Sequence, residues 1–224
     1  MSTELITFDV YMALMDIRGS LTPVVASALA SDDETADRIV SIWRAKQMDR
    51  AAISNSLGLG HTSFRDCTRQ GLDYALARSR FELPKVERES LVRAWDDLRP
   101  WPEAVEVVES IKLRGYKTAI LSNGDQDMLE AAARNFGSNI DHILSAEMAG
   151  AYKPSPKGYQ LPAHQLNIST NETVPVAGSP NDVLGAQVSG VRYFWSNREN
   201  DKVLDPAYSE TWKAKNLRGI LDLI

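Results

Sequence analysis

The fold is decided by one segment near the start of the chain, Glu4-Leu-Ile-Thr-Phe-Asp-Val-Tyr-Met-Ala-Leu-Met-Asp16. The apolar residues Leu5, Ile6 and Phe8 predict a short buried strand that ends at Asp9. A carboxylate at the carboxyl end of a central strand lies where open α/β sheets place their chemistry. Aspartate is also a common capping residue, so this segment alone favours a helix cap and a catalytic group equally.

The composition excludes several classes of protein. The net charge of the 224 residues is −5 and no dense run of Lys and Arg occurs, so no nucleic-acid partner is expected. No basic region followed by an apolar run stands near the N-terminus, and no apolar stretch approaches about 18 residues. We therefore predict neither a secretory signal nor a membrane span. Cys67 is the only cysteine, which excludes an internal disulfide and favours a reducing cytoplasm.

The distribution of apolar residues predicts two domains. Residues 17–97 have helical spacing throughout and are expected to form a helical-bundle cap. In this region Ser20 and Pro23 predict a helix that begins at Ser20, and a second helix is expected over 32–47. Residues 1–16 and 98–224 are expected to form the core, in which helices alternate with strands at 116–122, 140–145, 173–177 and 192–195. This alternation predicts an α/β fold, a doubly wound parallel sheet of the Rossmann-like type.

Four polar features occur in the connections of the predicted αβ units. They are Asp9, Ser122-Asn123-Gly124, Lys153-Pro154 and Ser179-Pro-Asn-Asp182. Each is individually typical of a turn, a solvated lysine or a helix cap. One such feature alone is readily explained as a turn or a cap. Four of them in this order, each in the connection of an αβ unit, indicate a common site.

In this combination the sequence resembles the haloacid dehalogenase superfamily, and specifically its L-2-haloacid dehalogenase branch. The resemblance extends through essentially the whole chain, including the predicted cap. The matching residues are Phe8-Asp-Val-Tyr11 with Leu14 and Asp16, Trp43-Arg44 with Lys46-Gln47, Leu121-Ser-Asn-Gly124, Tyr152-Lys-Pro154 with Pro156 and Tyr159, and Asn181-Asp182 with Gly185-Ala186.

The resemblance implies a hydrolase in which Asp9 attacks the carbon next to a small carboxylate and forms an ester. Lys153 would keep Asp9 ionised, because a nearby cation lowers the pKa of a carboxyl group. Ser122 would bind the substrate carboxylate, and Arg44 of the cap would receive the leaving group. Asp182, with Ser179, would position and activate the water that hydrolyses the ester.

Five further residues are expected to surround the substrate or support the catalytic groups. Tyr11 is expected both to pack in the core and to line the pocket, whereas Tyr159 is equally consistent with holding Lys153 and with covering the sheet. Asn123 is expected to shape its turn next to the substrate. The set is Tyr11, Met12, Asn123, Tyr159 and Asn181.

Two positions argue against phosphoryl transfer. The phosphatases that resemble this chain have a second aspartate two residues after the nucleophile, where Tyr11 stands here. They also have a metal-binding aspartate where Gly178 stands. Mg²⁺ needs several well-placed oxygen ligands. We therefore predict a metal-independent reaction without a cofactor.

The sequence departs from the dehalogenase pattern near the predicted nucleophile. Met12 and Ala13 replace the usual glycine and threonine, and Ala177, Ser179 and Asn181 replace a serine, an asparagine and a tryptophan. These changes leave open a second activity, hydrolytic ring opening of a strained cyclic carboxylate such as L-azetidine-2-carboxylate. A third interpretation is a degenerate, non-catalytic carboxylate binder. The expected assembly is a homodimer, which is common both in the resembling family and among proteins generally.

Overall fold

The structure, a computed structural model, describes residues 3–58, 60–208 and 212–224. The chain divides into two compact units. One consists of Met1–Met15 and Pro100–Ile224, and the other of Asp16–Arg99. These boundaries lie within two residues of the domain boundaries expected from the sequence.

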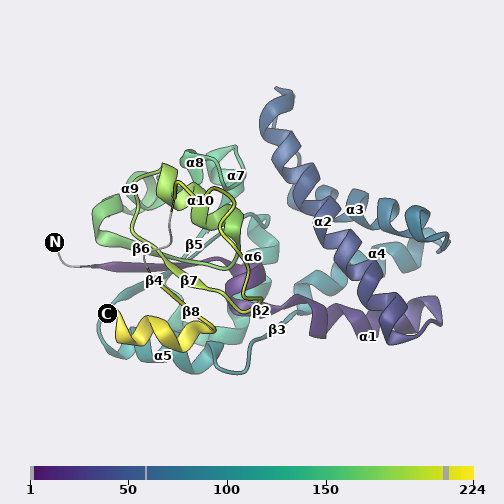
Figure 1. The fold of residues 1–224 in the computed structure, drawn as a ribbon, viewed down its shortest axis with the longest axis horizontal. Helices are drawn as coiled ribbons and strands as arrows, with labels where there is room; N and C mark the ends of the chain where they lie inside the picture. The colour runs from purple at the N-terminus through teal and green to yellow at the C-terminus, as the bar shows by residue number, and fades with distance from the viewer. Residues whose placement is uncertain (1–2, 59, 209–211) are drawn as a thin grey trace. The chain divides into compact units, whose positions relative to one another are not determined.

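A six-stranded parallel sheet forms the centre of the first unit (Figure 1). The strand order is β5-β4-β1-β6-β7-β8, so the chain winds outward in both directions from β1 and the predicted doubly wound fold is confirmed. The strands are β1 (Leu5–Phe8), β4 (Lys117–Ser122), β5 (His142–Ser145), β6 (Thr173–Ala177), β7 (Phe194–Ser196) and β8 (Lys213–Ala214).

Strand β1 is the buried centre of this sheet. All four of its residues are fully buried, and Phe8 pairs with Ile120 on one side and Val176 on the other. The main-chain N–H of Asp9 continues the ladder by donating to the carbonyl of Val176 at 3.0 Å. Because the strands are parallel, the residues that follow β1, β4 and β6 emerge at the same edge of the sheet.

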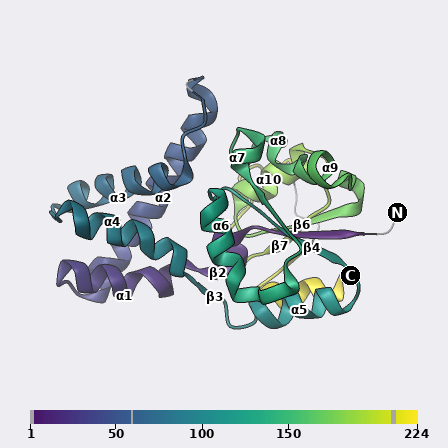
Figure 2. The same ribbon diagram turned by 180° about the vertical axis from the view of Figure 1, so that it is seen from behind.

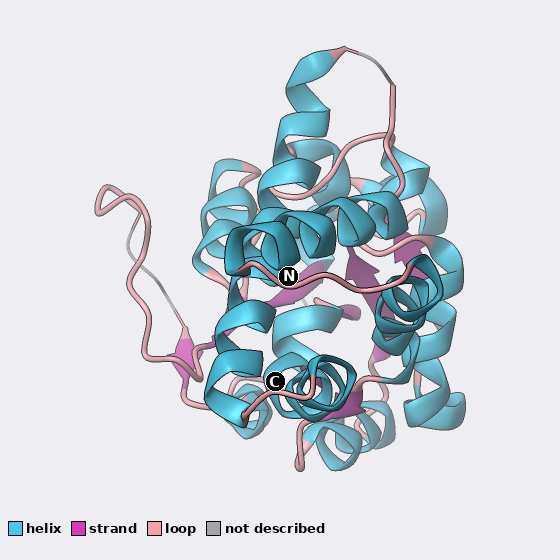
Figure 3. Cartoon of the chain, turned by 90° about the vertical axis from the view of Figure 1, so that its right-hand side faces the viewer, coloured by secondary structure: helices cyan, strands magenta, loops and turns pink. Residues whose placement is uncertain are grey.

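Helices cover both faces of the sheet (Figures 1 and 2). On one face lie α5 and the C-terminal η5, and on the other lie α8, α9 and α10. The helices are α5 (Ala104–Leu113), α6 (Gln126–Ala133), η3 (Arg134–Asn139), α7 (Ala146–Ala149), α8 (Pro156–Tyr159), α9 (Leu161–Leu166), η4 (Thr170–Glu172), α10 (Pro180–Val188) and η5 (Leu217–Asp222). Figure 3 distinguishes these helices from the strands by colour.

The second unit is helical, as predicted. Its longest helix, α2, packs against both α1 and α3, and α3 packs against α4. The two chain segments that connect the units, β2 and β3, form a two-stranded sheet. The elements are β2 (Met15–Asp16), α1 (Ile17–Leu29), α2 (Asp33–Leu57), α3 (Phe64–Ser79), α4 (Lys85–Arg93), η2 (Ala94–Asp97) and β3 (Arg99–Pro100). In the part of the chain that the structure describes, no helix has the length and apolarity needed to cross a membrane.

Two sequence-based helix boundaries in this unit were wrong. The first helix begins at Ile17 instead of Ser20, because the carboxylate of Asp16 accepts a hydrogen bond from the N–H of Gly19 at 2.8 Å and caps the helix earlier. The second helix continues to Leu57 instead of ending at Gln47, and Ala51 and Ser54 form its additional buried positions.

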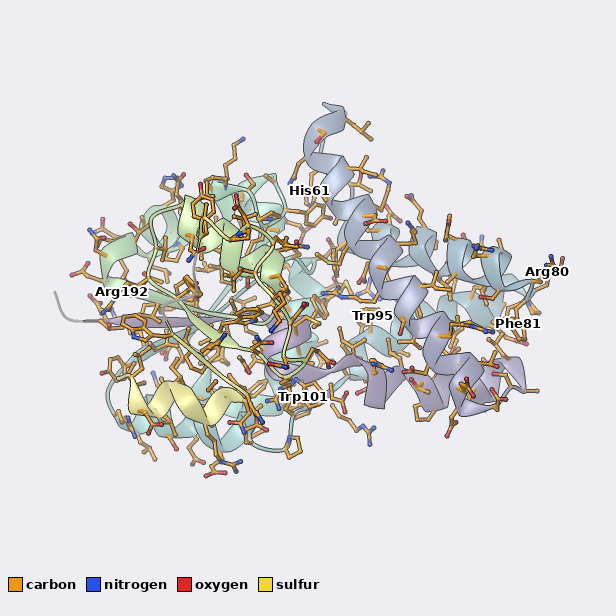
Figure 4. All side chains as sticks on the ribbon, in the orientation of Figure 1. His61, Arg80, Phe81, Trp95, Trp101 and Arg192 are labelled. Atoms are coloured by element: carbon orange, nitrogen blue, oxygen red, sulfur yellow. The ribbon has the colours of Figure 1, made fainter. Side chains whose placement is uncertain are left out.

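Two tryptophans form the core of the helical unit. Trp43 and Trp95 are both buried, and their rings meet edge to face with centroids 5.5 Å apart; Trp95 is labelled in Figure 4. The indole N–H of Trp43 donates to the carbonyl of Thr68 at 2.7 Å, which ties α2 to α3. Cys67 is fully buried beside this contact, as its helical surroundings predicted.

Candidate active site

Asp9 is the N-cap of η1, a single-turn π-helix over Val10–Leu14. The main-chain N–H of Met12 donates to Asp9 Oδ2 at 3.1 Å. The capping interpretation of Asp9 is therefore correct, but it accounts for one carboxylate oxygen only. Short π-helical turns often occur at functional sites, and this turn follows the central strand directly.

The other oxygen, Asp9 Oδ1, faces two side chains from later in the chain. Ser122 Oγ lies 3.1 Å from Oδ1 and Lys153 Nζ lies 3.4 Å from it. Ser122 Oγ also accepts a hydrogen bond from the N–H of Val10 at 3.3 Å, so its own hydrogen is directed to Asp9. Ser122 was expected to bind the substrate carboxylate, and the structure shows its hydroxyl orienting Asp9.

Lys153 also contacts a second carboxylate. Its Nζ lies 3.0 Å from Asp182 Oδ2, and the Lys153 and Asp182 side chains are each only 7% exposed. The hydroxyl of Tyr159 donates toward Asp182, within hydrogen-bond distance of Oδ1 and 3.0 Å from the main-chain oxygen. The structure thus connects four predicted residues in the order Asp9, Lys153, Asp182 and Tyr159.

Burial and charge shift the pKa values of this group. Burial disfavours the charged form of Lys153, but the carboxylates of Asp182 and Asp9 outweigh it and raise the lysine pKa. Burial raises the pKa of Asp182, and the negative charge of Asp9 adds to this against the opposing effect of Lys153. Burial, followed by the charge of Asp182, raises the pKa of Tyr159 well above its usual value. Tyr159 is therefore a neutral hydroxyl that donates its hydrogen.

The donor set around Asp9 fits an ammonium ion better than a divalent metal. Lys153 Nζ occupies the position between the two carboxylates. A Cβ at Gly178 would lie 2.4 Å from Met12 Cβ and 2.5 Å from the main-chain nitrogen of Ala13. An aspartate at this position would displace the backbone of η1. Among the described residues, no cluster of three or more His, Cys, Asp or Glu is arranged to hold a metal.

Two other predicted residues have supporting positions. Ser179 is the N-cap of α10, and its Oγ accepts from the N–H of Asp182 at 3.3 Å. Asn123 is buried, and its amide hydrogen-bonds to the main chain of Lys153.

The other four predicted residues differ from one another in burial and in the element that carries them. Tyr11 is buried, as expected, and Met12 is half-buried. Asn181 is exposed on α10, on the turn that carries Asp182. Arg44 lies in the helical unit on α2, where its guanidinium donates to Gln47 Oε1 at 2.6 Å.

No pattern in the sequence predicted that a tryptophan would support η1, the turn that follows Asp9. Trp101 Nε1 donates to the carbonyl of Met12 at 3.3 Å, and Trp101 is labelled in Figure 4. Trp101 precedes α5 by a few residues, where the sequence suggested only the boundary between the two domains. The pairing joins positions 89 residues apart and follows no local pattern.

Comparison with known proteins identifies the class. Residues 4–190 match the family model described as a haloacid dehalogenase-like hydrolase, and the chain belongs to that family of hydrolases. It is 31% identical to (S)-2-haloacid dehalogenase 4A of Burkholderia cepacia over 196 residues, which are 87% of this chain and 83% of that protein. It is 29% identical to haloacetate dehalogenase H-2 of Moraxella sp. (strain B) over 87% of this chain and 86% of that protein.

The solved structures agree with the sequence comparison. A crystal structure of an L-2-haloacid dehalogenase aligns with 100% of this chain and 99% of its own, with a TM-score of 0.91 and 26% sequence identity. The predicted family and fold class are confirmed.

We expect Lys153→Met to destabilise the protein, because buried Asp182 and partly buried Asp9 would both lose their cation. Removing one partner of a buried ion pair costs about 3–5 kcal/mol. The loss should depend on pH, since without Lys153 the pKa of Asp182 rises further and ionised Asp182 is disfavoured more in the folded protein than in the unfolded chain. Stability should therefore be retained below the pKa of an unfolded aspartate and lost as pH rises through the raised pKa.

Urea unfolding at about pH 5 and about pH 8 measures this difference. Lys117→Met is the matched control, because Lys117 pairs with Glu4 on the surface with a side chain that is 51% exposed. An exposed pair contributes about 0–1 kcal/mol, so this control should follow the wild type at both pH values. If Lys153→Met were as stable as the wild type at both pH values, Lys153 would not be the cation that stabilises Asp9 and Asp182.

Proposed function

We propose that this hydrolase acts on small 2-haloacids, most simply as an (S)-2-haloacid dehalogenase, through an ester on Asp9 and without a metal ion. One observation carries the proposal. Lys153 Nζ lies 3.4 Å from Asp9 Oδ1 and 3.0 Å from Asp182 Oδ2, between the two carboxylates. The ammonium pairs with one oxygen of Asp9, and a carboxylate can attack carbon and form an ester.

In the first step an Asp9 oxygen attacks C2 of the substrate as the carbon–halogen bond breaks. Oδ2 is the better candidate, because it accepts one main-chain N–H, whereas Oδ1 faces both Ser122 and Lys153. The halide leaves with the bonding electrons and needs no proton, so the absence of a carboxylic acid at Tyr11 is no obstacle. By its resemblance to the dehalogenases, Arg44 is the proposed cation for the halide.

In the second step water attacks the carbonyl carbon of the Asp9 ester and releases a 2-hydroxyacid. Asp182 is the proposed general base, and Ser179 holds the start of the helix that carries it. The raised pKa of Asp182 suits this role, since a base works best with a pKa near the working pH. A carboxylate has about four lone-pair sites, so Asp182 can accept a water hydrogen while bound to Lys153 and Tyr159.

The relatives support the choice of substrate class. The two curated relatives described above are named as a 2-haloacid dehalogenase and a haloacetate dehalogenase, and both align with more than four fifths of this chain. The homodimer and the cytoplasmic location stay predictions.

We expect the protein to release chloride from L-2-chloropropionate in the presence of EDTA, and Asp9→Asn to abolish this release. A neutral amide cannot form the ester, so the rate should fall by at least about 10⁴-fold. Asp32→Asn is the matched control, because Asp32 also caps a helix, accepting from the N–H of Thr35 at 2.8 Å, and asparagine caps equally well. Chloride release is followed by ion chromatography.

Two further substrates test for ring opening and for phosphatase activity. Consumption of L-azetidine-2-carboxylate without chloride release would keep Asp9 as the nucleophile and replace the proposed leaving group. Cleavage of phosphate esters only with Mg²⁺ would contradict the proposal.

We expect Tyr159→Phe to move the acidic limb of the kcat–pH profile to higher pH. The hydroxyl of Tyr159 donates to Asp182 and lowers its pKa, so its removal should raise that pKa and require a higher pH to ionise the base. Tyr193→Phe is the control, because Tyr193 is buried in the same apolar cluster and its hydroxyl accepts from Gln187. An unchanged acidic limb in Tyr159→Phe would exclude Asp182 as the titrating base.

A further inference from the structure

The turn after β4 is anchored by three consecutive residues. Ser122 Oγ donates to Asp9 Oδ1 at 3.1 Å. The carbonyl of Gly124 accepts from Ser145 Oγ at 2.6 Å, which ties the turn to the end of β5. Between them, Asn123 is 6% exposed, and its side chain reaches a residue much later in the chain. Hydrogen bonds to three other segments therefore hold this turn in place.

Asn123 binds both main-chain polar groups of Lys153. Its Oδ1 accepts from the N–H of Lys153 at 2.7 Å, and its Nδ2 donates to the carbonyl of Lys153 at 3.1 Å. The orientation of the amide is determined, because the reversed amide would set donor against donor and acceptor against acceptor. Buried hydrogen bonds of this kind are costly to lose without replacement.

Lys153 depends on this contact for its main-chain position. It lies between α7, which ends at Ala149, and α8, which begins at Pro156. Neither a helix nor a strand holds the main chain of Lys153 there. The side chain of Asn123 holds it instead, because it hydrogen-bonds to both the N–H and the carbonyl of Lys153. The ammonium of the same lysine reaches Asp9 and Asp182.

We propose that Asn123 is a positioning residue that fixes Lys153 relative to Asp9. Because Ser122 and Asn123 are adjacent, one turn sets both groups that face Asp9 Oδ1, the hydroxyl directly and the ammonium through the main chain of Lys153. The catalytic consequence rests on the proposed function, whereas the effect on Lys153 does not.

The chain contains a matched control for this contact. Asn197 is 7% exposed and makes the same pair of hydrogen bonds to a loop residue: its Oδ1 accepts from the N–H of Asp201 at 2.8 Å, and its Nδ2 donates to the carbonyl of Asp201 at 3.0 Å. Replacing Asn197 by alanine removes an equivalent pair of hydrogen bonds without involving Lys153.

The direct test is the reactivity of the Lys153 amine. The wild type, Asn123→Ala and Asn197→Ala are acetylated with trace reagent, and peptide mass spectrometry compares Lys153 with exposed Lys117 in each protein. In Asn123→Ala we expect Lys153 to react about tenfold faster, because loss of the two hydrogen bonds lets the segment open more often. In Asn197→Ala its reactivity should equal that of the wild type. Equal reactivity in Asn123→Ala and the wild type, or an equal increase in both variants, would overturn the proposal.

Turnover of L-2-chloropropionate gives the second readout. Asn123→Ala should lower kcat about tenfold and leave KM within about threefold, since a displaced lysine affects the reacting groups more than binding. A raised KM with unchanged kcat would show a substrate contact and overturn the proposal. If the alanine variant lacks a folded circular dichroism spectrum, Asn123→Ser carries both measurements with a smaller expected effect. The acetylation result holds even if no chloride is released, so failure of the proposed function is recognised separately.

Discussion

One buried ammonium, that of Lys153, lies between the carboxylates of Asp9 and Asp182, and the site is arranged around it. Removing such charges from water costs several kcal/mol each, and their attraction offsets this only when the remaining lone pairs are also satisfied. The surrounding groups meet that condition: Ser122 and the N–H of Met12 hydrogen-bond to the first carboxylate, and Tyr159 donates to the second. These groups come from segments that follow different strands, and the parallel sheet brings them to one edge.

Two positions near this ion pair support the proposed metal-independent reaction over metal-dependent phosphoryl transfer. A fold of this type accommodates several chemistries, and a few positions at the strand ends decide among them. At Gly178 the backbone of η1, the turn that follows Asp9, comes so close that no side chain fits. A metal-binding carboxylate is excluded there by packing, whereas the lysine supplies a positive charge from a different loop. Tyr11, two residues after Asp9, is buried and has no carboxylic acid to offer a leaving oxygen.

The sequence predicted the parts of the structure that local pattern determines. Strand β6, at Thr173–Ala177, has the predicted bounds. A run of five apolar or β-branched residues between polar turns is typical of a short buried strand. Strand β8 consists of only Lys213 and Ala214, and so short a strand leaves no periodicity to detect. For the site, residue types at strand ends and the family resemblance identified Asp9, Lys153 and Asp182. The pairing of Asn123 with the main chain of Lys153 joins residues 30 positions apart and is visible only in three dimensions.

The central claim, that Asp9 forms the ester, is tested most directly by a single turnover of L-2-chloropropionate in H₂¹⁸O with enzyme in excess. Hydrolysis of an Asp9 ester transfers one water oxygen to the carboxylate of Asp9 and leaves the original carboxylate oxygen in the product. Mass spectrometry should therefore find ¹⁸O in the peptide that contains Asp9 and unlabelled oxygen in the hydroxyl group of the product. Label in the product hydroxyl with none in that peptide would mean that water displaces the halide directly, and would contradict the role of Asp9 as the nucleophile.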